Sequence, residues 1–272
     1  MGVLDTVGGS CFGRWVVAQG ELDRVSGTVV LLHAGVADSR MWEPQVGPLR
    51  AAGYRIVAPD LRGHGERPRG SGSFSHMRDV AGLLRGESVV VGNSLGGRVA
   101  LELALHRPEL VSRLLLVAPG LPGWEWSDEV RAGWAMEGEA FDRGDLRTAA
   151  EVSVRMWVDG PTRSPNAVDS SVRSRVREMV LRSYELEIEA DGSLGAEEEL
   201  GGAAVGERLA EICCPTLVVV GERDTPDMLA IAAHVARSID GADLVTISDA
   251  AHLPSLERSD EFNRVLFAFL GS

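Results

Sequence analysis

The chain has 272 residues, of which 44% are hydrophobic and 25% charged, as in ordinary soluble globular proteins. Its formal net charge of −13 argues against nucleic acid or an anionic membrane surface as a partner. The N-terminus has no basic and apolar leader pattern, and no apolar stretch approaches membrane-spanning length. We therefore expect neither a secretory signal nor a membrane span.

The three cysteines, Cys11, Cys213 and Cys214, suggest neither a disulfide framework nor a metal site. We therefore expect a reducing, cytoplasmic location. No cluster of His, Cys, Asp or Glu has the spacing of metal ligands, and the glycine-rich turn described below lacks a phosphate-binding lysine. The sequence thus predicts no metal and no organic cofactor.

Short apolar stretches rich in β-branched residues recur along the chain and are typical of buried strands. The predicted strands cover residues 28–32, 54–58, 88–91, 113–117, 216–220 and 243–247. Helical patterns cover residues 41–52, 98–106, 226–239 and 259–270. Continuous apolar strands that alternate with helices indicate an α/β fold with a mostly parallel, doubly wound sheet. Residues 13–19 are a candidate for an additional antiparallel edge pair.

The turn Gly92-Asn93-Ser94-Leu95-Gly96-Gly97 lies between a predicted strand and a predicted helix. A serine on so tight a turn has a strained backbone and an exposed hydroxyl, and glycines two residues away on either side avoid clashes with the strand and helix. The bare G-x-S-x-G pattern also occurs in ordinary glycine-rich turns, but the flanking strand and helix favour a nucleophile elbow. Ser94 is therefore the predicted nucleophile.

Residues 120–210 interrupt the alternation of strands and helices. Three helices are predicted there, over residues 128–143, 145–158 and 166–189. We predict a core domain of residues 1–119 and 211–272, with residues 120–210 as a helical cap over the sheet edge where ligands bind. The insertion holds four of the six tryptophans: Trp124, Trp126, Trp134 and Trp157. These tryptophans either line a substrate cavity or only join the insertion to the core.

A serine nucleophile needs a base and a third group that orients the base. Among six histidines, His252 is the candidate base, because it lies in the loop that leaves the last predicted strand. Asp224 follows the preceding strand and is the candidate orienting carboxylate, with Glu222 and Asp227 as rivals.

The order Ser94, Asp224, His252 is the order found in α/β-hydrolases. The developing oxyanion would be bound by the backbone N–H of Leu95 and that of Gly35, in the loop after the first predicted strand.

Several segments resemble the α/β-hydrolase fold family. The segment Leu31-Leu32-His33-Ala34-Gly35 resembles the family's HG oxyanion segment, with alanine in place of glycine. Asp60-Leu61-Arg62-Gly63-His64-Gly65 resembles its D-x-R-G-x-G turn, and Ala251-His252 through Glu257 its terminal G-H-x-x-x-x-E segment. Trp42 matches a common family position. The resemblance implies a helical cap inserted after the sixth strand, closing over the active site.

Within that family, the serine at position 94 argues against the branches that use an aspartate nucleophile. The chain is more similar to enol-lactonase-like esterases in the segment Trp157-Val158-Asp159-Gly160-Pro161 and in the turn of residues 60–65. We therefore expect a cofactor-free serine hydrolase of a small carboxylic ester or lactone. The substrate would be apolar or cyclic, with Trp42, Trp124, Trp126, Trp134 and Trp157 as candidate binding residues. Two alternatives are a C–C bond hydrolase of a vinylogous diketone with the same triad, and a hydrolase-derived ligand-binding module with little turnover. The protein would be a monomer or a homodimer.

Overall fold

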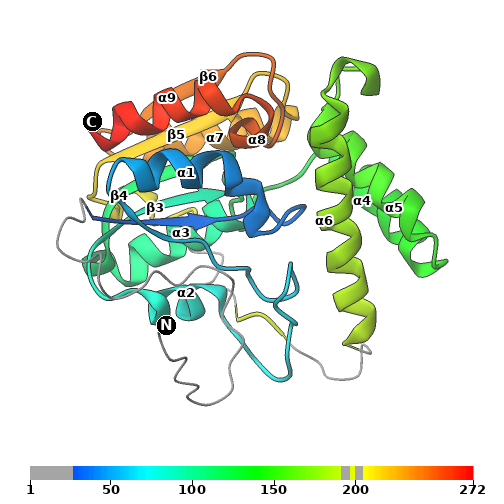
Figure 1. Ribbon diagram of the computed structural model, residues 1–272, viewed down its shortest axis with the longest axis horizontal. Helices are drawn as coiled ribbons and strands as arrows, with labels where there is room; N and C mark the ends of the chain where they lie inside the picture. The colour runs from blue at the N-terminus through cyan, green and yellow to red at the C-terminus, as the bar shows by residue number, and fades with distance from the viewer. Residues whose placement is uncertain (1–26, 191–196, 200–204, 272) are drawn as a thin grey trace, which may run out of the picture.

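The computed structural model describes residues 27–190, 197–199 and 205–271. In this part of the chain, six parallel strands form one sheet in the order β2-β1-β3-β4-β5-β6 (Figure 1). The strands are β1 (Thr28–Leu32), β2 (Arg55–Val57), β3 (Ser88–Asn93), β4 (Val111–Val117), β5 (Thr216–Gly221) and β6 (Asp243–Ile247). The predicted parallel α/β sheet is confirmed. The candidate edge pair at residues 13–19 lies outside the described residues.

Helices cover both faces of the sheet, and each face has its own apolar core. Helices α1 (Glu43–Ala51) and α9 (Ser259–Leu270) pack on one face, whereas α2 (His76–Leu83), α3 (Leu95–His106) and α7 (Pro226–Ser238) pack on the other (Figure 1). In β1, Val29 and Leu31 belong to the first core, and Val30 and Leu32 to the second. Burial of both faces explains why the strands are continuously apolar rather than alternating.

Three long helices between β4 and β5 stand beside the sheet (Figure 1). They are α4 (Asp128–Asp142), α5 (Leu146–Val154) and α6 (Ser170–Glu189). A π-helical turn, Arg155–Asp159, continues α5. This insertion follows the fourth strand that the structure describes; the expected count of six included the edge pair. Shorter helices are Ser39–Trp42, Pro108–Leu110, Pro165–Ala167, Leu209–Glu211 and α8 (Pro254–Glu257).

Helix α6 is anchored on the loops that follow β1 and β2. The backbone N–H of Asp38 lies 3.4 Å from the Met179 sulfur, and Arg182 donates to the Gly65 carbonyl over 3.2 Å. Val176 and Met179 join the same apolar core as the strands. The insertion therefore lies at the carboxyl ends of the strands, where open α/β sheets bind ligands. Among the described helices, none is long and apolar enough to cross a membrane.

Candidate active site

Ser94 lies at the sharp turn between β3 and α3. Its φ of 52° is positive, which is uncommon for a residue with a side chain. A Cβ atom on Gly92 would lie 2.2 Å from the Gly96 carbonyl oxygen, and one on Gly96 would lie 2.2 Å from the Leu32 carbonyl oxygen. Only glycine fits at both positions, so the two glycines of the motif are required by close approach of strand and helix.

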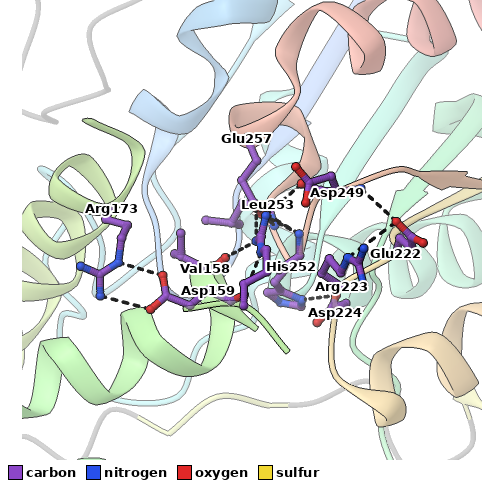
Figure 2. Close-up of polar contacts among 12 residues, drawn as sticks. Val158, Asp159, Arg173, Glu222, Arg223, Asp224, Asp249, His252, Leu253 and Glu257 are labelled. Carbon is purple, nitrogen blue, oxygen red and sulfur yellow. Dashed lines mark hydrogen bonds and ion pairs between the residues drawn. The ribbon is translucent and has the colours of Figure 1, made fainter. Parts of the chain in front are cut away.

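His252 and Asp224 are brought together by the ends of two neighbouring strands. His252 Nδ1 lies 2.9 Å from Asp224 Oδ2, and both side chains are almost fully buried (Figure 2). Of the two rival carboxylates, Glu222 accepts from the Asp249 N–H and Asp227 accepts from the Ser127 N–H. Of the three carboxylates, Asp224 is therefore the one that is hydrogen-bonded to the His252 ring.

Two partners hold the backbone of the His252 loop. The Glu257 carboxylate accepts the N–H groups of Ala251 and Leu253, which flank the histidine. The N–H of His252 itself donates to the Trp157 carbonyl in the π-helical turn, over 3.1 Å. These three consecutive amides are all engaged, so the ring is presented by a rigid loop.

Asn93 ties this loop to the serine turn. Its fully buried side-chain amide donates to the carbonyls of Val117, at 3.1 Å, and His252, at 3.2 Å. The partly exposed Ser94 hydroxyl makes no hydrogen bond to any described residue, so a contact between Ser94 Oγ and His252 Nε2 is not formed in this structure. Such contacts are commonly long without substrate and tighten in the complex.

Gly35 lies close to Leu95, the residue after Ser94. A Cβ atom on Gly35 would lie 3.8 Å from the Leu95 Cβ, so the two candidate oxyanion donors are neighbours. The Ala34 carbonyl accepts from His33 Nδ1–H at 2.8 Å and from the Ala37 N–H at 3.0 Å. Because a trans peptide has its C=O and N–H on opposite sides, these bonds fix the direction of the Gly35 N–H. In the described structure, neither candidate N–H has a protein acceptor.

Three of the tryptophans in the insertion form a row of rings that begins at His252. The Trp157 ring centroid lies 4.5 Å from that of His252, Trp134 lies 6.4 Å from Trp157, and Trp126 lies 5.0 Å from Trp134. Trp157 is buried, whereas Trp134 is 39% exposed. The row therefore runs from the histidine to an accessible aromatic surface.

The other two candidate tryptophans have different surroundings. Trp42 is fully buried and packs against Phe262 at 6.1 Å, so it belongs to the core and offers no accessible surface to a ligand. Trp124 donates from Nε1 to Asp227 at the start of α7, over 3.3 Å. This second tryptophan joins the insertion to the core, as in the alternative that the sequence left open.

Some residues of this site carry little signal in the sequence. The link that Asn93 makes to His252 depends on a loop 159 residues later in the chain. Glu257 lies in the segment that resembles the family's terminal G-H-x-x-x-x-E segment, but the resemblance alone assigned no role to this glutamate. Arg163, which pairs with Glu257, lies in a loop of the insertion with no recognisable motif. In the described parts of the chain, no three His, Cys, Asp or Glu side chains are grouped as metal ligands would be.

Comparison with known proteins decides the family. The model of the "Alpha/beta hydrolase family" matches residues 29–265. The chain belongs to the α/β hydrolase family. The predicted fold class is thereby confirmed, and so is the coarse prediction of a hydrolase.

Two curated relatives and one solved structure illustrate the range of this α/β hydrolase's relatives. The chain is 30% identical over 255 residues to the dihydrolipoyllysine-residue acetyltransferase component of the acetoin cleaving system of Cupriavidus necator, covering 90% of this chain and 63% of that protein. It is 27% identical to the 2-hydroxy-6-oxononadienedioate/2-hydroxy-6-oxononatrienedioate hydrolase of Paraburkholderia xenovorans, covering 89% and 86%. A thermophilic esterase from Thermogutta terrifontis matches with a TM-score of 0.72 and 26% identity, covering 90% of each chain.

Proposed function

We propose that this protein is a serine hydrolase that cleaves a small carboxylic ester or lactone. The observation that carries the proposal is the buried 2.9 Å hydrogen bond between His252 and Asp224, on a loop that Asn93 ties to the Ser94 turn. A buried carboxylate on one ring nitrogen leaves the other nitrogen to act as a base, which is the arrangement that activates a serine.

In the proposed mechanism, Ser94 Oγ attacks the substrate carbonyl while His252 Nε2 accepts its proton. Asp224 holds the ring in the tautomer with the proton on Nδ1 and stabilises the imidazolium that forms. The N–H groups of Gly35 and Leu95 bind the oxyanion. His252 then returns the proton to the leaving alcohol, and a water molecule activated by the same ring releases the acyl group from Ser94.

The surroundings of the site favour an apolar or cyclic substrate. Partly buried apolar side chains come from the oxyanion loop and the serine turn, as Val36 and Leu95, and from the insertion, as Trp126 and Met156. With the accessible Trp134, they supply hydrophobic surface of the kind that lines small-molecule sites. In this proposal helices α4–α6 act as the cap that shields the acyl-enzyme from bulk water.

The test is hydrolysis of a p-nitrophenyl ester by two variants. Ser94→Ala should abolish turnover and labelling by a fluorophosphonate probe while the protein stays folded. Asp224→Asn should lower kcat by roughly 10⁴-fold, because the wrong tautomer is then favoured. Glu222→Gln, in the same loop but without contact to His252, is the matched control and should retain wild-type kcat. Normal turnover by Ser94→Ala would contradict the proposal, and a folded wild-type protein without labelling would favour a binding module.

A second candidate reaction uses the same residues on a carbon–carbon bond. The similarity to the Paraburkholderia xenovorans hydrolase favours it, since the named substrate of that enzyme carries the 2-hydroxy and 6-oxo groups of a vinylogous diketone. The Asn93-containing turn also motivates this alternative. Parallel assays on a ring-fission product and on simple esters separate the two reactions. A strong preference for the diketone would reverse the ranking.

A further inference from the structure

A buried ion pair connects the insertion to the loop that carries His252. The Arg163 guanidinium, in the segment after the π-helical turn, lies 2.5 Å from the Glu257 carboxylate, and both side chains are under 10% exposed. Arg163 also donates to the carbonyl of Asp249, at 2.9 Å, just before the His252 loop. Its Nε donates to the carbonyl of Asp159, and its Nη2, which also binds Glu257, donates to the carbonyl of Val158, both in the π-helical turn. One side chain therefore joins four backbone or carboxylate oxygens from two parts of the chain.

Glu257 links Arg163 to the backbone on both sides of His252. Its carboxylate accepts the N–H groups of Ala251 and Leu253 over 3.0–3.1 Å, immediately on both sides of His252 (Figure 2). Burial raises the pKa of Glu257, whereas Arg163 and the two N–H groups favour its charged form. Without the guanidinium, the carboxylate would be a buried and unpaired charge, and it would protonate or move. Either response weakens its hold on the loop.

We propose that Arg163, acting through Glu257, is a positioning residue that sets the His252 ring for proton transfer. This inference rests on the proposed function, because it assigns His252 as the base. Arg163 itself is buried, and its hydrogen bonds to described residues go to Val158, Asp159, Asp249 and Glu257 rather than to Ser94 or the His252 ring. Its loss should therefore slow the chemical step and leave substrate binding intact.

The first experiment compares two arginine variants of the insertion in ester hydrolysis. Arg163→Met should lower kcat by about 100-fold, the order expected for a displacement of roughly 1 Å, with KM within threefold of wild type. Added guanidinium ion should restore part of kcat. The matched control is Arg173→Met, which removes a partly buried insertion guanidinium from Asp159 and Glu151 but leaves Asp159 its ion pair with Arg155. The control should keep wild-type kcat, and an unchanged kcat in folded Arg163→Met would overturn the proposal.

A double variant distinguishes positioning from stability. Replacing both partners, as Arg163→Met with Glu257→Leu, removes the buried charges together and should restore resistance to denaturant, as apolar replacement of buried ion pairs often does. The loop amides remain without their acceptor, so kcat should stay about 100-fold low. This variant also replaces Arg163→Met if the single variant does not fold. Recovery of kcat along with stability would show a purely structural role and overturn the proposal.

A readout without substrate keeps this inference distinct from the proposed function. The Nδ1 proton shared between His252 and Asp224 should give a low-field proton resonance, assigned by its loss in Asp224→Asn. It should shift or broaden in Arg163→Met and remain in Arg173→Met. A wild-type protein that hydrolyses no ester would contradict the proposed function, while this resonance would still test whether Arg163 positions the His252 ring. An unmoved resonance in Arg163→Met would overturn the positioning role of Arg163.

Discussion

The side-chain amide of Asn93 donates to the backbone carbonyl of His252 across 3.2 Å. The residue before Ser94 therefore holds the loop that presents the imidazole ring, and the same amide group binds the Val117 carbonyl at the end of β4. One side chain therefore joins the ends of β3 and β4 to the loop of His252. The position of Ser94 relative to His252 thus does not depend on a hydrogen bond between the Ser94 hydroxyl and the His252 ring.

Replacing this amide should damage turnover more than the loss of stability alone explains. Asn93→Ala removes the side-chain donor of the His252 carbonyl and leaves the Val117 carbonyl with only the Ser94 N–H. The free energy of unfolding should therefore fall by about 1–3 kcal/mol, measured by urea denaturation. The loop is then released from the serine turn, and kcat for ester hydrolysis should fall by about tenfold or more with little change in KM.

The matched control lies at the opposite end of the sheet. Thr216→Val removes a hydrogen bond from a buried hydroxyl to the Cys214 carbonyl at the start of β5. Its free energy of unfolding should also fall, by about 1 kcal/mol, but kcat should be unchanged. If Asn93→Ala behaved like Thr216→Val, the link between Asn93 and His252 would have no role in turnover.

The centre of the sheet was predictable because β1, β3, β4 and β5 are buried on both faces. Val29 to Leu32 read as an uninterrupted apolar run since adjacent residues enter opposite cores. Helix α2 (His76–Leu83) was not among the predicted helices, because within its eight residues Val80 is the only apolar side chain that is fully buried. The π-helical turn was also not predicted, because it ends at a tertiary contact that no local pattern encodes. Gly160, the residue after the turn, packs so closely on the Arg223 carbonyl that a Cβ atom would lie 2.2 Å from its oxygen.

The candidate site was predictable as far as it follows from strand ends. Ser94, Asp224 and His252 each follow a strand, and parallel strands bring their carboxyl ends to one edge of the sheet. The choice of Asp224 over its neighbours needed the observed 2.9 Å contact. Trp157 and Arg163 belong to the insertion, whose helices could be predicted one by one but whose docking on the His252 loop depends on tertiary contacts.

The accessible end of the tryptophan row should contribute to binding of aromatic substrates. Trp134 is 39% exposed and lies 6.4 Å from Trp157, which stacks beside His252. Trp134→Ala should raise KM for a phenyl or naphthyl ester by about tenfold, consistent with loss of one aromatic contact, and should leave KM for an ethyl ester nearly unchanged. The measurement is a comparison of the two esters with the same acyl group.

An exposed apolar residue of the same helix serves as the control. Met136 is 59% exposed and carries no aromatic ring to extend the row of tryptophans. Met136→Ala should therefore leave both KM values unchanged. Equal effects of Trp134→Ala on the two esters would show that the tryptophan packs the insertion rather than binding an aromatic group.

His33 makes the stability of the protein depend on pH. Its ring is fully buried, with Nδ1–H donating to the Ala34 carbonyl and Nε2 accepting from the Leu61 N–H. The ring is therefore neutral, and burial, assisted by the nearby His64, lowers its pKa from 6.5 to about 4. The unfolded chain binds a proton at this position below pH 6.5, whereas the folded chain does so only near pH 4. Stability is thus lost as the pH falls through this window.

Urea denaturation of the wild-type protein and of His33→Asn at pH 7 and pH 5 tests this dependence. The unfolding free energy of the wild-type protein should fall by about 2 kcal/mol more than that of the variant between these two pH values, because the variant has no ring to protonate at this position. His64 and His76, whose pKa values burial also lowers, remain in both proteins, so their contributions to the pH dependence largely cancel in the comparison. Hydrogen bonds and ion pairs lower the pKa values of the carboxylates of Asp60, which is buried, and Asp79, which is partly buried. Their protonation destabilises the protein only at more acidic pH, outside this window. Equal pH slopes for the two proteins would show that His33 is protonated in the folded state or makes no difference to it.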